Sequence, residues 1–176
     1  MLESILFVLY TADLLQLIRT YNLTPHGYAD DTQILGICHH STTDELQRRM
    51  SDCIDDVSTW MKAKRLLLNH NKTEVLWCSS SRRQHQIPTA FVRVGTSDVQ
   101  PVSVVRNLGV YINSDVTLRA HVTATVRACF AALRQIRSVR QCLPRDAVVT
   151  LVLAVVISKV DYCNSVMAGA SPAVGC

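Results

Sequence analysis

Two adjacent acids near the start of the chain, Asp30 and Asp31, constrain its fold more than any other feature. Short β-prone runs flank them, at residues 27–29 and 32–37. Two extended runs around a polar pair predict a β-hairpin that turns at the acids. Because adjacent carboxylates repel each other, they are tolerated at a solvated turn or where a cation holds them together. Both interpretations stay open at this point.

Helical patterns lie on both sides of this hairpin. Residues 2–17 are apolar on most faces and predict a largely buried helix. Residues 42–65 predict an amphipathic helix, with Thr42 and Glu45 at capping-box spacing. Its expected buried stripe consists of Leu46, Met50, Cys53, Ile54, Val57, Trp60 and Met61.

Extended patterns follow this helix. Residues 72–79 predict a strand and residues 80–86 a polar, basic loop. A hairpin is expected over residues 91–95 and 99–102. Residues 107–112 predict one more strand, with a glycine where a side chain would be unwelcome.

The last third of the chain is helical by pattern. Residues 119–140 carry a helical apolar stripe, and Pro144 opens a last helix that reaches about residue 160. The apolar run 147–157 is too short to span a bilayer and predicts a buried helix. The chain is therefore expected to be α+β in front and all-α behind. The stripe consists of Val122, Val126, Cys129, Phe130, Leu133 and Ile136.

Composition and charge set the class of protein. The 176 residues are 48% hydrophobic and 18% charged, which is typical of a globular chain with one domain and at most an appended subdomain. Residues 117–176 hold seven basic and two acidic side chains, whereas residues 1–116 hold 11 and 12. A basic rear is compatible with a polyanion partner, although basic helix faces are usually only solvated.

Cysteine usage and the apolar runs indicate the compartment. Seven cysteines without a C-x-x-C pair predict reduced thiols in an intracellular protein, cytoplasmic or nuclear. The run 38–40 (Cys-His-His) suggests half of a metal site, but a second ligand pair at finger spacing does not accompany it. The apolar run 5–10 follows no basic region, so neither a signal peptide nor a membrane partner is expected.

Several segments, in order, resemble one family. YADD resembles the motif C hairpin of reverse transcriptases, and its surroundings resemble the enzymes of LINE-type (non-LTR) retrotransposons of the Jockey and chicken-repeat kind. The resemblance covers nearly the whole chain, and the ordered set is far more specific than YADD alone. The matching segments are 6–14 (end of motif B), 28–31 (motif C), 60–80 (motif D), 105–122 (the Leu-Gly primer grip, motif E) and 156–169 (thumb).

The resemblance implies an α+β fold in two parts. Residues 1–115 would form a partial polymerase palm, with the motif C hairpin, a helix and antiparallel strands. Residues 116–176 would form an all-α, thumb-like region. The implied activity is RNA-directed DNA polymerisation on an RNA template and a DNA primer, by two-metal chemistry with Mg²⁺.

The resemblance also assigns roles to single residues. Asp30 would ligate Mg²⁺ directly and Asp31 would support it, as the catalytic and metal-binding pair. Tyr28 would lie near the primer's terminal nucleotide, and Lys72 near the incoming triphosphate. The segment that holds the primer end would contain Leu108 and Gly109. The side chains expected on the nucleic-acid backbone are Arg127, Arg134, Arg137 and Arg140.

Part of the family pattern has no counterpart in these 176 residues. The match begins inside motif B, so the motif A aspartate and the fingers are not included, and residues 3–4 (Glu-Ser) replace the usual Gly-Pro. Loss of a bridging metal ligand costs several kcal/mol of transition-state stabilisation, roughly thousands-fold in rate. We therefore expect this chain alone to be inactive as a polymerase.

Other interpretations remain for the same residues. The chain is alternatively a non-catalytic module that binds nucleic acid through its basic thumb helix. It is otherwise a small α+β protein that contains YADD by chance. In those cases Lys72 is an exposed strand-edge charge and Leu108 an ordinary core residue.

Overall fold

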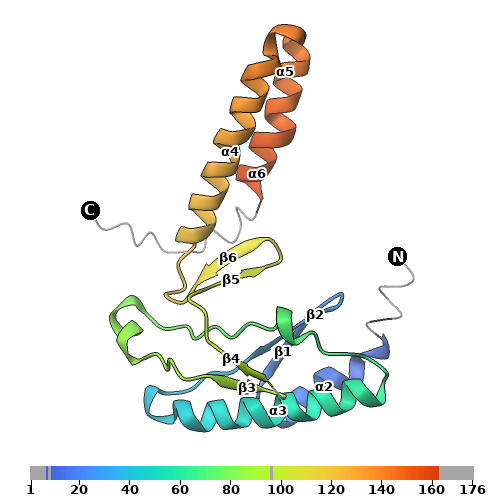
Figure 1. The fold of residues 1–176 in the computed structure, drawn as a ribbon, viewed down its shortest axis with the longest axis vertical. Helices are drawn as coiled ribbons and strands as arrows, with labels where there is room; N and C mark the ends of the chain where they lie inside the picture. Colours follow the sequence, from blue (N-terminus) through green and yellow to red (C-terminus); the bar gives the residue numbers. More distant parts are fainter. Residues whose placement is uncertain (1–6, 8, 96, 163–176) are drawn as a thin grey trace. The chain divides into compact units, whose positions relative to one another are not determined.

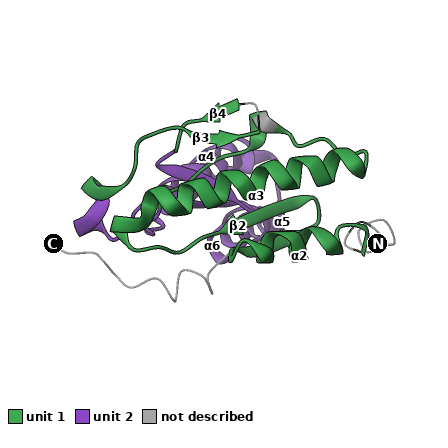
Figure 2. Cartoon of the chain, turned by 90° about the horizontal axis from the view of Figure 1, so that it is seen from below, with its two compact units in different colours: residues 1–77, 85–101 green, residues 78–84, 102–176 purple. Residues whose placement is uncertain are grey.

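A computed structural model describes residues 7, 9–95 and 97–162 (Figure 1). Internal contacts divide the chain into two compact units, residues 1–77 with 85–101 (unit 1) and residues 78–84 with 102–176 (unit 2) (Figure 2). Within the described residues, helices combine with three two-stranded antiparallel sheets, which agrees with the predicted α+β class. The palm and thumb boundary after residue 115 is defined by the family resemblance and stays a prediction.

Unit 1 is built on two helices and two hairpins. Helix α3 packs against α2 and β3, and β1 packs against α2. The apolar residues of α3 recur every three or four positions, so one face of the helix is buried. The elements are α2 (Ala12–Thr20), β1 (Thr24–Tyr28), β2 (Asp31–Leu35), η1 (His40–Thr42), α3 (Thr43–Ala63), η2 (His70–Lys72), β3 (Val92–Val94) and β4 (Ser97–Val99).

The core of unit 1 confirms the stripe predicted for α3. Leu46, Cys53, Ile54 and Val57 are buried, and the partly buried Met50, Trp60 and Met61 pack beside them. The α2 and β1 sides of the core contribute Leu14, Ile18 and Leu23.

The first helix is less buried than predicted. The helix α2 begins at Ala12, and residues 7, 9 and 10 are also helical, whereas residues 1–6 and 8 lie outside the described part. Leu14 and Ile18 are buried, but Leu9 and Tyr10 are exposed. The prediction of a largely buried helix was wrong for the described residues, because α2 buries mainly the side that packs against α3 and β1.

The start of α3 was placed correctly, but the predicted cap was not. Thr42 is the N-cap residue and makes no side-chain cap hydrogen bond. Its hydroxyl instead donates to the backbone oxygen of His39 at 3.0 Å. The preceding 3₁₀ turn η1 draws the Thr42 side chain back toward residue 39, so the capping box does not form.

The two single strands predicted after α3 were wrong in different ways. Residues 73–80 are irregular, because a strand needs a neighbouring backbone to pair with. Ser79 donates its N–H to Ser114 O at 2.9 Å, but no ladder follows along the described residues. Residues 107–112 contain a turn between two strands instead of one strand.

Unit 2 joins a β-hairpin to a long helical hairpin. In Figure 1, α4 runs antiparallel to the continuous α5–η5–α6 arm and lies beside it. The segment η5 is a π-helical stretch within that arm. The elements are η3 (Ser81–Gln86, which extends into unit 1), β5 (Val104–Asn107), β6 (Val110–Asn113), α4 (Arg119–Val139), η4 (Arg140–Cys142), α5 (Arg145–Val152), η5 (Leu153–Ile157) and α6 (Ser158–Asp161).

The helical hairpin has a narrow core. Cys129 and Ala132 of α4 pack against Val156, and Val152 and Val155 lie beside them. The helix bounds were predicted well, but the prediction of a buried helix at 147–157 was wrong, because Val156 alone in that segment is buried. Two packed helices cover only one side of each other within the described residues. The exposed apolar side chains are Val122, Val126, Phe130, Leu133, Val149, Leu153 and Ile157.

Two remaining expectations concern membranes and thiols. No helix in the described part of the chain has the length and apolar character to cross a membrane. The described cysteines that are free thiols are Cys38, Cys53, Cys78, Cys129 and Cys142. Cys163 and Cys176 lie outside the described residues, as does the end of the thumb-like segment 156–169.

Candidate functional site

The predicted hairpin around the tandem acids is present. Strands β1 and β2 pair antiparallel, with Tyr28 opposite Asp31, so the turn consists of Ala29 and Asp30 alone. Ala29 has a φ of 52°, in the left-handed region that disfavours residues with a Cβ by about 1 kcal/mol. A positive φ is usual at a central position of a two-residue hairpin turn.

The two carboxylates are free to accept a ligand. Asp30 and Asp31 are both exposed, and within the described residues neither carboxylate forms a hydrogen bond or an ion pair. Adjacent, unpaired carboxylate oxygens suit a hard cation such as Mg²⁺. No group of three or more potential metal-ligating side chains occurs among the described residues. The pair therefore offers oxygen donors but not a complete set of ligands.

Tyr28 and Lys72 belong to the same unit as the acids. Tyr28 is exposed and is paired across the strands with Asp31, which places the two side chains on one face of the hairpin. Lys72 is also exposed, but it ends the 3₁₀ turn η2 and donates its N–H to Asn69 O at 3.0 Å. Its interpretation as a strand-edge charge was wrong, because no strand forms there.

The predicted primer-end segment is a tight turn in unit 2. Leu108 and Gly109 form the two-residue connection between β5 and β6, because Asn107 pairs with Val110. Their φ angles are 45° and 84°, and positive values at both central positions define a type I′ turn. Leu108 is 43% exposed, so it is not an ordinary core residue. Gly109 fits the turn for a physical reason that sequence reasoning did not give.

A basic groove lies at the start of α4, within unit 2. Its volume is about 370 Å³, and its lining includes two arginines and no acid. Arg119, Thr123 and Arg127 recur every four residues and so follow one face of the helix. The full lining is Asn113, Arg119, Ala120, Thr123, Ala124 and Arg127.

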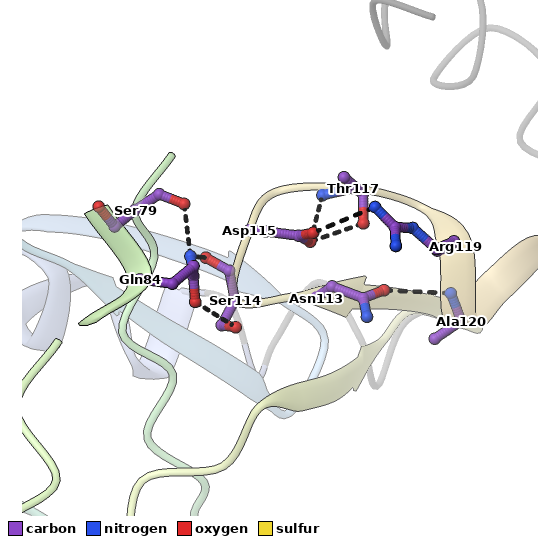
Figure 3. A network of polar contacts seen from close by, with 8 residues as sticks. All are labelled: Ser79, Gln84, Asn113, Ser114, Asp115, Thr117, Arg119 and Ala120. Atoms are coloured by element: carbon purple, nitrogen blue, oxygen red, sulfur yellow. Dashed lines mark hydrogen bonds and ion pairs between the residues drawn. The ribbon is translucent and has the colours of Figure 1, made fainter. Parts of the chain in front are cut away.

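A hydrogen-bonded loop fixes one side of this groove (Figure 3). Asn113 accepts from the backbone N–H of Ala120 at 3.1 Å and so satisfies a donor in the first turn of α4. Ser114 donates its hydroxyl to Gln84 Oε1 at 3.0 Å, and Gln84 Nε2 donates to the backbone oxygens of Ser79 and Ser114. The base of the β5–β6 hairpin is therefore held in place.

Asp115 organises the turn into the helix. Its carboxylate accepts from the hydroxyl and the N–H of Thr117, at 2.6 and 3.1 Å. The hydrogen bond from the Thr117 hydroxyl, followed by the backbone bond and the charge of Arg119, lowers the pKa of Asp115 despite its partial burial. Arg119 approaches Asp115 at 3.7 Å and keeps a largely exposed side chain. Its guanidinium thus remains accessible to an anion.

The arginines predicted on the nucleic-acid backbone lie on α4 and η4. All four are exposed, and none forms an ion pair within the described residues. Arg127 lies in the groove, and Arg134 follows it seven residues later on nearly the same helix face. The other two are Arg137, in the last turn of α4, and Arg140, the first residue of η4.

Three features were missed by sequence reasoning. Arg119 and Thr123 carried a usable signal, the four-residue spacing that leads to Arg127. Asn113 gave a weaker one, since a polar residue often precedes a helix. Tyr162, whose hydroxyl donates to Leu108 O at 2.6 Å, is 54 residues away from its partner, and local sequence carries no signal for that contact.

Comparisons with known proteins identify no relative of this chain. No family model matches the chain, and neither a curated protein nor a solved structure matches it. The functional argument therefore depends on the residues and their geometry.

Proposed function

We propose that these 176 residues form the part of a non-LTR retrotransposon reverse transcriptase that extends from the end of motif B into the thumb. As an isolated polypeptide, the chain binds an RNA template paired with a DNA primer and does not extend the primer efficiently. The observation that carries the proposal is the two-residue turn at Ala29 and Asp30, which leaves both carboxylates of the YADD segment exposed and unpaired within the described residues.

The chemistry of the pair supports a magnesium-binding role. Asp30 and Asp31 are the residues that would hold Mg²⁺, since hard cations prefer carboxylate oxygens. When bound, Mg²⁺ would stabilise negative charge on the oxygens that attack and leave during nucleotide addition. Tyr28, exposed beside Asp31, would supply an aromatic surface near the primer end. Two carboxylates are fewer than a two-metal centre needs, which is why the isolated chain is expected to be inactive.

The groove and its arginines favour a second candidate function, nucleic-acid binding without catalysis. Arg127 and Arg119 line a shallow, open groove, and the exposed Arg127 has no acidic partner among the described residues, so it suits a phosphate contact. Contacts to phosphates position a duplex but do not read its sequence. In this alternative the Asp30–Asp31 turn is only a hydrated loop.

Primer extension tests the catalytic part of the proposal. The purified chain is incubated with an RNA template, a DNA primer, deoxynucleotides and Mg²⁺. We expect incorporation at the background level of a reaction without protein. Robust incorporation that is lost in Asp30→Ala would contradict the proposed inactivity of the isolated chain.

Equilibrium binding tests the nucleic-acid part. Fluorescence anisotropy of a labelled primer–template, measured over a range of salt concentrations, gives the slope of log K against log salt. Each lost phosphate contact reduces that slope by about 0.9. We therefore expect Arg127→Ala to lower the slope by about 0.9, whereas Arg19→Ala, an exposed arginine of unit 1, leaves it unchanged. Salt-independent binding, or equal effects of the two variants, would refute the assigned role.

A further inference from the structure

We infer that Tyr162 is a positioning residue for the Leu108–Gly109 turn. Its hydroxyl donates to Leu108 O at 2.6 Å, across 54 residues of sequence. A Cβ placed on Gly109 would lie 3.2 Å from the same hydroxyl oxygen and 3.3 Å from Cε1 of the ring. The tyrosine thus bonds one residue of the turn and covers the other. That this turn meets a primer end rests on the proposed function.

The turn needs external support because of its backbone. Leu108 has a φ of 45°, which is uncommon for a residue with a branched, bulky side chain. Gly109, at 84°, tolerates its conformation, and the ring of Tyr162 occupies the space that a side chain would need. The hydrogen bond to Leu108 O stabilises the carbonyl in the direction that this turn gives it.

The position of Tyr162 links the turn to the helical hairpin. Tyr162 directly follows α6, and its N–H donates to Ser158 O at 3.1 Å, so its backbone is tied to the end of the helix. Its side chain then reaches the β5–β6 turn, within the same unit. The carbonyl of Leu108 is occupied by this bond, whereas the Leu108 side chain stays exposed. A held turn presents that side chain to a ligand in one arrangement.

Amide exchange in the free, full-length chain tests whether Tyr162 holds the turn. Tyr162→Phe removes only the hydroxyl. Losing one hydrogen bond predicts about 2- to 10-fold faster exchange of the Val110 amide, which closes the turn, and a changed Gly109 amide shift. Tyr10→Phe is the matched control, because Tyr10 also donates to a backbone oxygen 54 residues away, Lys64 O at 2.8 Å, in unit 1. Unchanged exchange at Val110 in Tyr162→Phe would overturn the inference.

Binding to two duplexes tests the positioning role itself. One duplex has a recessed 3′ end on an RNA template, and the other is blunt and equally long. We expect Tyr162→Phe to lower the preference for the recessed end about 2- to 10-fold without changing affinity for the blunt duplex. An equal loss for both duplexes would overturn the positioning role. If the wild-type chain binds neither duplex, the proposed function fails, and the exchange experiment still decides whether Tyr162 holds the turn.

Discussion

The β1–β2 and β5–β6 hairpins both turn in two residues, yet their turns are supported differently. The first hairpin is fixed at its base, where Gly36 lies against Leu46 and Leu23 in the core of unit 1. Its turn at residues 29–30 has no hydrogen bond or ion pair from side chains elsewhere in the described chain. The second hairpin is fixed at its base by Gln84 and Ser114, and also at its turn by Tyr162.

This difference suggests that the two turns would bind a ligand in different ways. At the first turn the carboxylates are free, so a bound cation would relieve the repulsion between them. A turn held by a distant side chain is already arranged before a ligand arrives, so less ordering is needed on binding. Three substitutions test the contrast, from the largest expected effect to the smallest, and a fourth prediction concerns pH.

The largest effect is expected at the base of the first hairpin. A Cβ at residue 36 would lie 2.5 Å from Cδ1 of Leu46 and 3.1 Å from Cδ2 of Leu23. Because Leu46 is buried and has little room to move, Gly36→Ala should destabilise the chain by about 1–3 kcal/mol in urea unfolding. Gly27→Ala is the control, since its Cβ would meet only Leu15, at 3.8 Å. Equal stability of the two variants would contradict a base-anchored hairpin.

The second effect concerns the held turn. Gly109→Ala places a Cβ at a φ of 84° and beside the Tyr162 hydroxyl. We expect a loss of about 1–2 kcal/mol in the free energy of unfolding, from backbone strain together with the contact. In a Tyr162→Ala background the contact is absent, so the cost of Gly109→Ala should fall. Full additivity of the two changes in a double-mutant cycle would show that Tyr162 does not press on the turn.

At the Ala29–Asp30 turn, a substitution should raise stability slightly instead of lowering it. Ala29→Gly relieves the strain at a φ of 52° but adds the conformational entropy of glycine to the unfolded chain. The two terms nearly cancel, so we expect stability to rise by about 0.5 kcal/mol or less. A loss above about 1 kcal/mol in the same urea assay would mean that the Ala29 methyl group makes a contact that stabilises the turn.

The fourth prediction is a pH dependence in the core that anchors the first hairpin. Burial, with a contribution from the charge of Asp56, raises the pKa of the Cys53 thiol from 9.0 to about 11. The folded state favours the neutral thiol, so its contribution to stability is complete below pH 9 and is lost between about pH 9 and 11. Urea unfolding across that window should show a decline that is smaller in Cys53→Ala. Identical declines would exclude Cys53 as its source.

Alkylation provides a control for the same thiol. The exposed Cys142 should react with iodoacetamide well before Cys53 when labelled sites are mapped by mass spectrometry. Gly36→Ala should speed labelling of Cys53 by loosening the core around Leu46. If the labelling rate of Cys53 does not change in Gly36→Ala, the base of the first hairpin is not coupled to the core around Leu46.

Local patterns predicted the helices and the first hairpin because their signals lie within a few residues. The bounds of α3 followed from its apolar spacing, and the first hairpin followed from the β-prone runs around the acids, although its turn is Ala29–Asp30 and Asp31 begins β2. Burial of residues 147–157 was predicted poorly, since it depends on how many partners a helix acquires. Val149 and Leu153 have core character in sequence but remain exposed beside a single packed helix. The strand predicted at residues 72–79 was wrong because these residues have strand propensity but no neighbouring strand among the described residues to pair with.

The site could be predicted only in part for a similar reason. Resemblance proposed Asp30, Asp31 and the Leu108–Gly109 segment as site residues, and the β-prone runs predicted a hairpin turn next to the acids. It did not predict that Leu108 and Gly109 turn the chain, because positive φ angles in a non-glycine residue depend on external support. Tyr162 provides that support from a distant position, which is a property of the folded chain alone.

The central claim of the proposal is that the carboxylates of Asp30 and Asp31 bind a divalent cation beside nucleic acid. The most direct test adds Mn²⁺, a paramagnetic substitute for Mg²⁺, to the ¹⁵N-labelled chain with a primer–template. We predict selective broadening of the amide signals of residues 28–32, lost in Asp30→Ala. Asp44 and Glu45, an exposed adjacent pair in the first turn of α3, are the internal control. Broadening at Asp44 and Glu45 that equals or exceeds broadening at the turn would contradict the claim.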